Sequence, residues 1–366
     1  MSARPHPPAA QIVRFSRQYL QLEPSPRFPD DHLLRQDETQ DFLYKKLFAP
    51  DALTCAPPLR YQLRILKELV SRIEASIDDW DQHGISDDLV TSLSGLLSTP
   101  LPSEIIEAQQ KCYVTYHQST LKPNPPSDST HDPQITLLES RAIIAAGGTT
   151  GLRTWEASLH LGQYLCENPS LIRGRRILEL GAGTGYLSIL CAKHLNAEHV
   201  VASDGSDDVI NNLPDSLFLN GLQGSAQVVP MDLKWGHSLV GTEEQEWNGG
   251  RQVDLVIGAD ITYDQRLIPS LVGTLQELSD MFIHAEIIIS ATERNIQTFE
   301  KFLNVAQHAG YHVEYVDFPV TAREKQMGPF YEDTTPIHIC KLARKRLRGG
   351  FGSMPSQSPL TVVWES

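Results

Sequence analysis

From about residue 150 onward, short apolar runs alternate with segments of helical length. The apolar runs are rich in β-branched residues and lie at 175–181, 199–204, 226–233, 253–260 and 285–292. The segments between them that are long enough for helices include 185–195, 206–220 and 294–309. Strands that alternate with helices in this way form a parallel sheet covered by helices on both faces.

Two further strand-like runs, 312–319 and 337–342, follow without an obvious helix between them. Consecutive strands without a crossover helix pair antiparallel, so these two are expected to pair with each other at the end of the sheet. The sequence therefore predicts an α/β fold built on a seven-stranded, Rossmann-like sheet.

The region before this alternation, residues 1–121, has helical periodicity instead. Apolar residues recur at intervals of three or four in three groups: Ile12, Phe15, Tyr19 and Leu20; Leu66, Leu69, Val70, Ile73 and Ile77; Leu89, Val90, Leu93, Leu96 and Leu97. Such spacing predicts amphipathic helices. The region contains no catalytic constellation, so we expect an N-terminal helical extension that docks a substrate.

Two segments bound the predicted sheet domain, which covers residues 134–342. Residues 122–133 contain four prolines among polar residues, which predicts an exposed linker. The tail, residues 343–366, begins with a basic run and continues with Pro and Ser, which predicts a solvated, partly disordered end. A nuclear-localisation or RNA-binding patch is the alternative for the basic run.

The charge and the cysteines narrow the class of protein. A formal net charge of −14 argues against a general nucleic-acid binder and permits a basic protein partner. No stretch is apolar enough to span a membrane, and the first residues lack the apolar core of a secretory signal. The five cysteines are scattered without a CxxC pair, so we expect neither disulfides nor a metal site, and a cytoplasmic location. Without an apparent exposed apolar stripe, a monomer is expected.

Residues 179–185, Glu-Leu-Gly-Ala-Gly-Thr-Gly, follow a strand and open a helix. Glycines there let the chain turn sharply and approach a ligand closely. A dinucleotide loop reads GxGxxG, whereas here the third glycine comes one residue early and the acidic Glu179 precedes the loop. That carboxylate suits a ligand with an ammonium and a sulfonium, so the loop favours S-adenosyl-L-methionine over NAD. A tight turn without a ligand is the alternative.

Acidic and aromatic residues follow the next two strands. Asp204 ends the second strand, where a carboxylate can accept both hydroxyls of a ribose. Asp207 and Asp208 are the N-terminal caps expected for the following helix. After the third strand, Trp235 is expected to pack on an adenine and Asp232 to meet its exocyclic amine. Core packing is the alternative for the tryptophan.

The fourth strand ends with Gly258, Ala259 and Asp260, and Tyr263 follows. The two small residues allow close approach to a ligand. Asp260 and Tyr263 would stand where a methyl group is delivered, because they can hold a lysine amine in line and accept its hydrogen bonds. The alternative for Asp260 is a cap on the next helix.

Three motifs together resemble a known family. They are TTGLRTWE (149–156), LELGAGTG (178–185) and VIGADITY (256–263). Over residues 135–342 the chain is similar to the seven-β-strand protein-lysine methyltransferases, also called methyltransferase family 16. Within them it most resembles the eukaryotic enzymes that methylate translation elongation factor 2, a subgroup that also carries a helical N-terminal extension.

The resemblance implies a function and a set of site residues. It implies methyl transfer from S-adenosyl-L-methionine to a lysine of elongation factor 2, with Asp260 and Tyr263 near the reactive methyl. It assigns cofactor contacts to Trp155, Gly181, Ala182, Gly183, Asp204, Trp235 and Ala259. Three other functions compete: an NAD-dependent enzyme, a methyltransferase that acts on another protein or a small molecule, and a non-catalytic binding protein.

Overall fold

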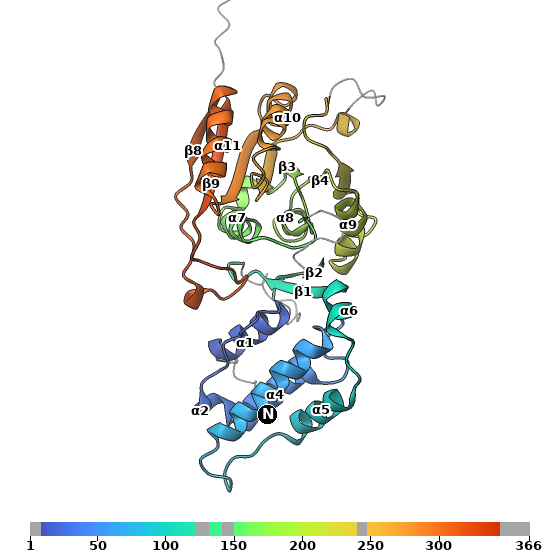
Figure 1. Cartoon of the computed structure of the whole chain (residues 1–366), viewed down its shortest axis with the longest axis vertical. Coiled ribbons are helices and arrows are strands. Elements are labelled where there is room, and N and C mark those ends of the chain that lie inside the picture. The colour runs from blue at the N-terminus through green and yellow to red at the C-terminus, as the bar shows by residue number, and fades with distance from the viewer. Residues whose placement is uncertain (1–8, 122–131, 141–149, 240–246, 345–366) are drawn as a thin grey trace, which may run out of the picture.

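The computed structural model describes residues 9–121, 132–140, 150–239 and 247–344. These residues build a sheet domain and a helical region that lies beside it (Figure 1). Most of the predicted linker and the tail from residue 345 lie outside the described residues. No helix within the described ranges is both long and apolar enough to cross a bilayer.

The sheet domain contains the seven-stranded sheet that the sequence predicts. Its strands are β3 (Arg176–Leu180), β4 (His199–Asp204), β5 (Val228–Asp232), β6 (Leu255–Ala259), β7 (Glu286–Thr292), β8 (Tyr311–Tyr315) and β9 (Ile337–Arg344). They lie in the order β5-β4-β3-β6-β7-β9-β8, and β5 to β7 are all parallel in this order. β9 pairs antiparallel with both β7 and β8, which confirms the antiparallel end and places the last strand inside it.

The three central strands β3, β4 and β6 end at the same edge of the sheet. β3, β4 and β6 are buried along almost their whole length because helices cover both faces, which explains their continuous apolar sequences. Leu180 at the end of β3 lies in register with Ser203 of β4 and Gly258 of β6. The loops that follow these three strands therefore start side by side.

Helices cover the sheet on both faces (Figure 1). One face carries α7 (Glu156–Glu167), α8 (Tyr186–Ile189), which continues as the π-helix η3 (Leu190–His194), and α9 (Asp207–Leu219). The other carries α10 (Ile268–Met281) and α11 (Ile296–His308). Each face has its own apolar core, as a parallel sheet requires. Short 3-10 turns are η2 (Pro169–Leu171), η4 (Trp247–Gly250) and η5 (Arg323–Lys325).

The helical region is confirmed and has a third apolar core. It contains α1 (Ala10–Leu20), α2 (Asp31–Leu34), α3 (Asp37–Leu43), η1 (Tyr44–Phe48), α4 (Leu59–Ser76), α5 (Asp87–Ser98) and α6 (Glu104–Gln109). Phe15 and Tyr19 of α1 are completely buried there, together with Leu66 of α4. α5 buries Leu89 but leaves Leu97 exposed, so its apolar stripe is only partly covered.

A two-stranded antiparallel hairpin, which the sequence analysis did not predict, joins the two parts. β1 (Lys111–His117) pairs with β2 (Gln134–Ser140) across the Pro-rich segment. Val114 and Ile135 belong to the core beneath α7, α8 and α9. The hairpin therefore packs with the sheet domain, although β1 falls within the residues expected to be helical.

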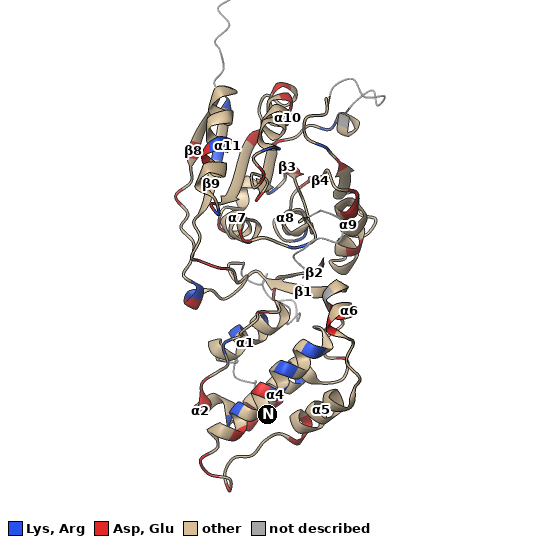
Figure 2. Ribbon diagram, viewed as in Figure 1, with Lys and Arg blue, Asp and Glu red and all other residues tan. Residues whose placement is uncertain are grey.

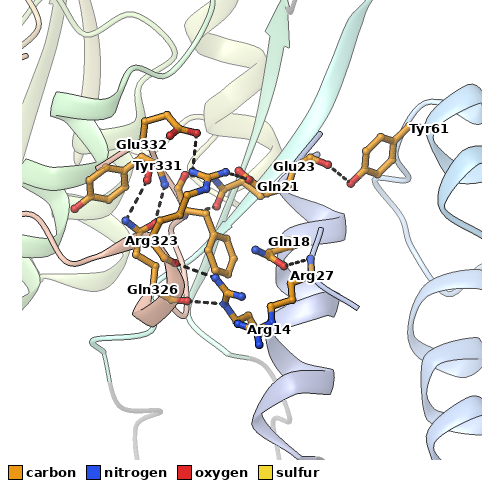
Figure 3. Close-up of polar contacts among 11 residues, drawn as sticks. Arg14, Gln18, Gln21, Glu23, Arg27, Tyr61, Arg323, Gln326, Tyr331 and Glu332 are labelled. Atoms are coloured by element: carbon orange, nitrogen blue, oxygen red, sulfur yellow. Dashed lines mark hydrogen bonds and ion pairs between the residues drawn. The ribbon is translucent and has the colours of Figure 1, made fainter. Parts of the chain in front are cut away.

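Polar contacts fasten α1 to the connection between β8 and β9, residues 316–336 (Figure 3). Arg14 donates from Nε to the carbonyl of Gln326 at 3.0 Å and from Nη2 to the carbonyl of Arg323 at 2.9 Å. Arg323 in turn forms ion pairs with Glu23 and Glu332. Both hydrogen bonds of Arg14 end on backbone carbonyls, so they fix the path of the β8–β9 connection against α1.

Gln21 makes the most complete of these contacts. Its buried amide donates to the carbonyl of Phe330 at 2.5 Å and accepts from the N–H of Phe330 at 2.8 Å. The next residue, Tyr331, donates its hydroxyl hydrogen to Gln163 Oε1 at 2.6 Å, and Gln163 belongs to α7. The β8–β9 connection thus links the end of α1 to α7, which follows residues 150–155.

We expect Gln21→Ala to lower the free energy of unfolding by about 2–4 kcal/mol, because two buried backbone groups of Phe330 lose their partners. Urea denaturation monitored by fluorescence measures the change. Gln11→Ala is the matched control, since Gln11 near the start of α1 makes two exposed hydrogen bonds to Asp30. Equal losses for the two variants would show that the contact with Phe330 contributes nothing specific.

Candidate active site

A cavity of about 660 Å³ opens at the edge where β3, β4 and β6 end. Its walls come from the loops that follow these strands and β5, and from residues 150–155 in front of α7. It is lined by every residue to which the family resemblance assigns a role: Trp155, Gly181, Ala182, Gly183, Asp204, Trp235, Ala259, Asp260 and Tyr263. Residues spread over more than 100 positions of sequence therefore meet in one site.

The glycine loop between β3 and α8 forms the floor of the cavity. Gly181 and Gly183 have φ angles of +66° and +53°, in the left-handed region that favours glycine. A Cβ on Gly183 would lie 2.9 Å from the carbonyl oxygen of Gly151, which is closer than van der Waals contact allows. Both the backbone conformation and the close approach of residues 150–155 therefore require glycine at position 183.

Asp204 stands beside the glycine loop at the end of β4. Its Oδ2 accepts the N–H of Gly183 at 3.1 Å, and its Oδ1 accepts the N–H of Ser206 at 3.0 Å. Burial raises the pKa of Asp204, and these backbone hydrogen bonds oppose the rise. Each carboxylate oxygen retains a lone pair after these bonds, so Asp204 can accept two further hydrogen bonds from a ligand.

The loop after β5 brings one of its two candidate residues to the cavity. Trp235 lines the cavity as expected, together with the buried Leu233. Asp232, in contrast, is exposed and lies 3.4 Å from Lys234 Nζ, outside the residues that line the cavity. Asp232 is the last residue of β5 and does not line the cavity, so its contact with the adenine amine stays a prediction.

Asp260 occupies a strained backbone position at the end of β6. Its φ is +53°, which is rare for a residue other than glycine and costs about 1–3 kcal/mol. Its Oδ1 accepts the N–H of Thr292 at 2.9 Å, and its Oδ2 accepts from Thr292 Oγ1 at 3.1 Å. The side chain is only 8% exposed. These bonds to β7 hold the carboxylate in the cavity wall and do not cap a helix.

The residues around Asp260 have separate tasks. Ala259 and Tyr263 line the cavity, and Tyr263 is 57% exposed at its rim. Gly258 was expected to make room for a ligand, but a Cβ there would lie 2.5 Å from Ile261 Cδ1. The small residue at 258 therefore accommodates the side chain of Ile261, which itself lines the cavity.

Trp155 immediately precedes α7 and forms another wall of the cavity. Its Nε1 donates to the carbonyl of Thr150 at 3.0 Å. The guanidinium carbons of Arg153 and Arg294 each lie 5.0 Å from the centre of its ring system, within the range of cation–π contacts. Arg294 also forms ion pairs with Glu156 and Asp260.

Arg294 is a site residue that was not predicted from the sequence. Arg294 follows β7 by two residues and lines the cavity. The carboxyl ends of parallel strands meet at one edge of a sheet, and this rule, applied to the fifth predicted strand, would have found it.

A buried hydrogen-bond network behind the cavity was missed as well. Thr154 Oγ1 lies 2.7 Å from Glu139 Oε1 and 2.7 Å from Thr184 Oγ1. Tyr116 donates its hydroxyl hydrogen to the same Glu139 oxygen at 2.8 Å. Glu139 is in β2, so this network ties the hairpin to the glycine loop and to the segment before α7. This network could not be predicted from the sequence, because β2 itself was not predicted.

Glu179 is buried outside the lining of the cavity, so its expected contact with an ammonium group stays a prediction. Its carboxyl group is 2% exposed, accepts a hydrogen bond from Ser188 Oγ in α8, and is not among the cavity-lining residues. Burial raises the pKa of Glu179 to about 8. Burial therefore favours the protonated form of this carboxyl group, which lies outside the cavity lining.

Glu179 is expected to make the stability of the protein depend on pH. Its folded-state pKa of about 8 exceeds its ordinary value of 4.5, so folding favours the protonated acid. This contribution is complete below pH 4.5 and is lost as pH rises through 8. The wild type should lose on the order of 3 kcal/mol of unfolding free energy over this interval, and Glu179→Gln should lose much less. Urea titrations at several pH values measure the difference; identical slopes in both proteins would contradict it.

The shape and chemistry of the cavity suit S-adenosyl-L-methionine. Its volume lies in the range of small-molecule sites. Asp204 offers two free acceptor positions, and the apolar surfaces of Leu233 and Trp235 stand beside it for a flat ring. The glycine loop lets the ligand approach backbone closely. The residues present therefore fit this cofactor.

Comparison with known proteins agrees with this geometry. Residues 139–309 match the lysine methyltransferase family. The chain is 57% identical over 334 residues to protein-lysine N-methyltransferase EFM3 of Chaetomium thermophilum, covering 91% of this chain and 98% of that protein. It is 30% identical over 295 residues to protein-lysine N-methyltransferase EEF2KMT of Homo sapiens, covering 78% and 80%, respectively.

The similarity to the Chaetomium thermophilum protein extends over nearly the whole of both chains and so includes the helical region as well as the sheet domain. Similarity of this extent, together with the family match over the glycine loop and the end of β6, makes the assignment. The chain belongs to the family of S-adenosyl-L-methionine-dependent protein-lysine N-methyltransferases.

Proposed function

We propose that this enzyme methylates the ε-amine of a lysine in translation elongation factor 2, in the cytoplasm. The observation that carries the proposal is similarity along both parts of the chain to relatives named EFM3 and EEF2KMT. Because the sheet domain alone does not encode a target, similarity that includes the helical region supports a shared target. A different protein substrate is the second candidate.

In this proposal, the cofactor is held by the floor and one wall of the cavity. Asp204 accepts the two ribose hydroxyls through its free lone pairs, and Trp235 packs on the adenine. The loop of Gly181, Ala182 and Gly183 lies against the methionine part. Trp155 and Ala259 complete the contacts on the opposite side.

The substrate amine approaches from the rim. S-adenosyl-L-methionine, when bound, supplies an electrophilic methyl group on its sulfonium. Asp260 and Tyr263 accept hydrogen bonds from the amine and orient it, and orientation contributes most of the rate. The nucleophile is the free amine, since an ammonium has no lone pair.

The helical region is proposed to dock the substrate protein. It presents large apolar side chains to solvent: Trp80 is 60% exposed, Leu97 61% and Ile105 74%. Such side chains on a surface are typical of protein-binding sites when they gather. Acidic residues lie on both the helical region and the sheet domain (Figure 2), so the net charge of −14 favours basic segments of a partner on either part.

The test is transfer of radiolabelled methyl from S-adenosyl-L-methionine into a lysate of cells that lack this protein. We expect one strong band on a gel at the size of elongation factor 2, and no band with the Asp260→Asn enzyme. A strong band of another size would retain lysine methylation and reject the target. An absence of protein labelling by an enzyme that binds the cofactor would reject the proposed function.

A further inference from the structure

Arg294 connects three parts of the cavity wall. Its Nη2 lies 3.3 Å from Asp260 Oδ2 at the end of β6, and the same nitrogen forms an ion pair with Glu156 at the start of α7. Its guanidinium carbon is 5.0 Å from the centre of the ring of Trp155. Arg294 itself lines the cavity and is 41% exposed. It is thus placed at the rim, where a substrate side chain would enter.

Two carboxylates at the rim, Asp260 and Glu156, share Arg294 as their cationic partner. The side chain of Asp260 is 8% exposed and that of Glu156 is 22% exposed, so both carboxylates are poorly screened by water. Arg153 also lines the cavity and contacts the ring of Trp155, and it adds a second positive charge at the rim.

The other charged groups near the rim have polar partners of their own. Asp264 pairs with Arg266 at 2.7 Å, and Lys234 pairs with Asp207 and Asp232 at 3.5 and 3.4 Å. Glu293 lies 2.8 Å from Nε2 of the His338 ring. Asp204 lies on the cofactor side of the cavity and is held by backbone N–H groups. A change at Arg294 therefore acts mainly through Asp260 and Glu156.

We propose that Arg294 is a positioning residue that balances the charge of Asp260 and Glu156, so that the substrate lysine is held at the cavity as a free amine. The inference rests on the proposed function, because it requires a lysine beside Asp260. A lysine beside two unbalanced carboxylates would be stabilised as the ammonium, which cannot attack. Arg294 lets Asp260 accept a hydrogen bond from the amine without favouring its protonation.

The experiment compares the pH dependence of turnover in four proteins: wild type, Arg294→Gln, Arg294→Lys, and the double variant Glu156→Gln with Arg294→Gln. Methyl transfer into the acceptor band of the deletion lysate is measured between pH 6.5 and 10 with saturating cofactor. Arg294→Gln should raise the apparent pKa of the acidic limb by about one unit, which lowers turnover about tenfold at neutral pH and restores it at high pH.

The other two variants separate charge from packing. Arg294→Lys keeps the charge and should keep the wild-type pH profile. The double variant removes one carboxylate together with the cation, so its profile should return toward that of the wild type. Arg266→Gln is the control, since it removes an exposed arginine that pairs with Asp264 outside the cavity wall; its profile should match the wild type.

Three outcomes would overturn the inference. If Arg294→Gln lost the same fraction of turnover at every pH, the role of Arg294 would be merely structural. The same conclusion would follow if the double variant lost more turnover than Arg294→Gln alone. Loss in Arg294→Lys as large as in Arg294→Gln would show that charge is not the reason. If the wild type labels no acceptor at any pH, the proposed function fails and the inference fails with it. The wild-type measurement alone distinguishes this result from the variant results above.

Discussion

Asp204→Ala is expected to bind S-adenosyl-L-methionine at least about 100-fold more weakly than the wild type. The variant loses two hydrogen bonds from ribose to a charged group, each worth about 1.5–3 kcal/mol, and each 1.4 kcal/mol corresponds to tenfold in affinity. It also releases the N–H groups of Gly183 and Ser206, which now bond to the carboxylate. Isothermal titration calorimetry measures the affinity directly.

The matched control for this prediction is Asp208→Ala. Asp208 is an exposed carboxylate in the first turn of α9 and does not line the cavity. Its removal should leave the affinity within about twofold, since surface substitutions change interaction energies by less than about 0.5 kcal/mol. Equal affinity of the wild type and Asp204→Ala would refute the assignment of Asp204 to the ribose.

Asp260→Asn is expected to lower turnover by about 100-fold or more and to change cofactor affinity only a few-fold. Asparagine is preferred to alanine because it tolerates the φ of +53° at this position, so backbone strain does not add to the effect. The amide can still accept from Thr292, but it lacks the charge that pairs with Arg294. Single-turnover kinetics and calorimetry on the same preparation measure the two quantities.

Tyr263→Phe provides the comparison for Asp260→Asn. It removes one hydroxyl at the rim and leaves the ring in place, so a smaller loss of turnover is expected, about tenfold. If Asp260→Asn weakened cofactor binding as strongly as it lowers turnover, the carboxylate would belong to the cofactor site and its proposed contact with the amine would be lost.

The fold was largely predictable because its strands are buried on both faces. Such strands read as short apolar runs between helices, and β3 to β7 all lie within their predicted ranges. The β1–β2 hairpin escaped prediction because its halves are separated by the Pro-rich segment. Lys111 and Tyr113 at the start of β1 are exposed, so the strand shows no clean alternation. The hairpin is buried because α1 packs against β1 and α9 packs against β2, and local sequence does not encode these contacts.

The positions of site residues followed from strand ends, but the directions of their side chains did not. Asp204 is the last residue of β4 and Asp260 directly follows β6, and both line the cavity as expected. Glu179 lies two residues before Gly181 in the sequence, yet its carboxyl group accepts a hydrogen bond from Ser188 of α8 and does not line the cavity. Successive side chains of a strand point to opposite faces of the sheet. A shift of one residue therefore decides whether a side chain packs against a covering helix or reaches the ligand.

The contacts between α1 and the β8–β9 connection also bear on how the chain is made. Arg14 and Arg17 bond to carbonyls about 310 residues later, so α1 leaves the ribosome long before its partner exists. β9 is the last strand and lies between β7 and β8, so the sheet cannot close earlier either. Domains fold as units during synthesis, the N-terminal one first. A nascent chain stalled before residue 323 is therefore expected to hold a folded helical core in which Arg14 still lacks its backbone partners, and protease protection of that core should precede the protection of the sheet.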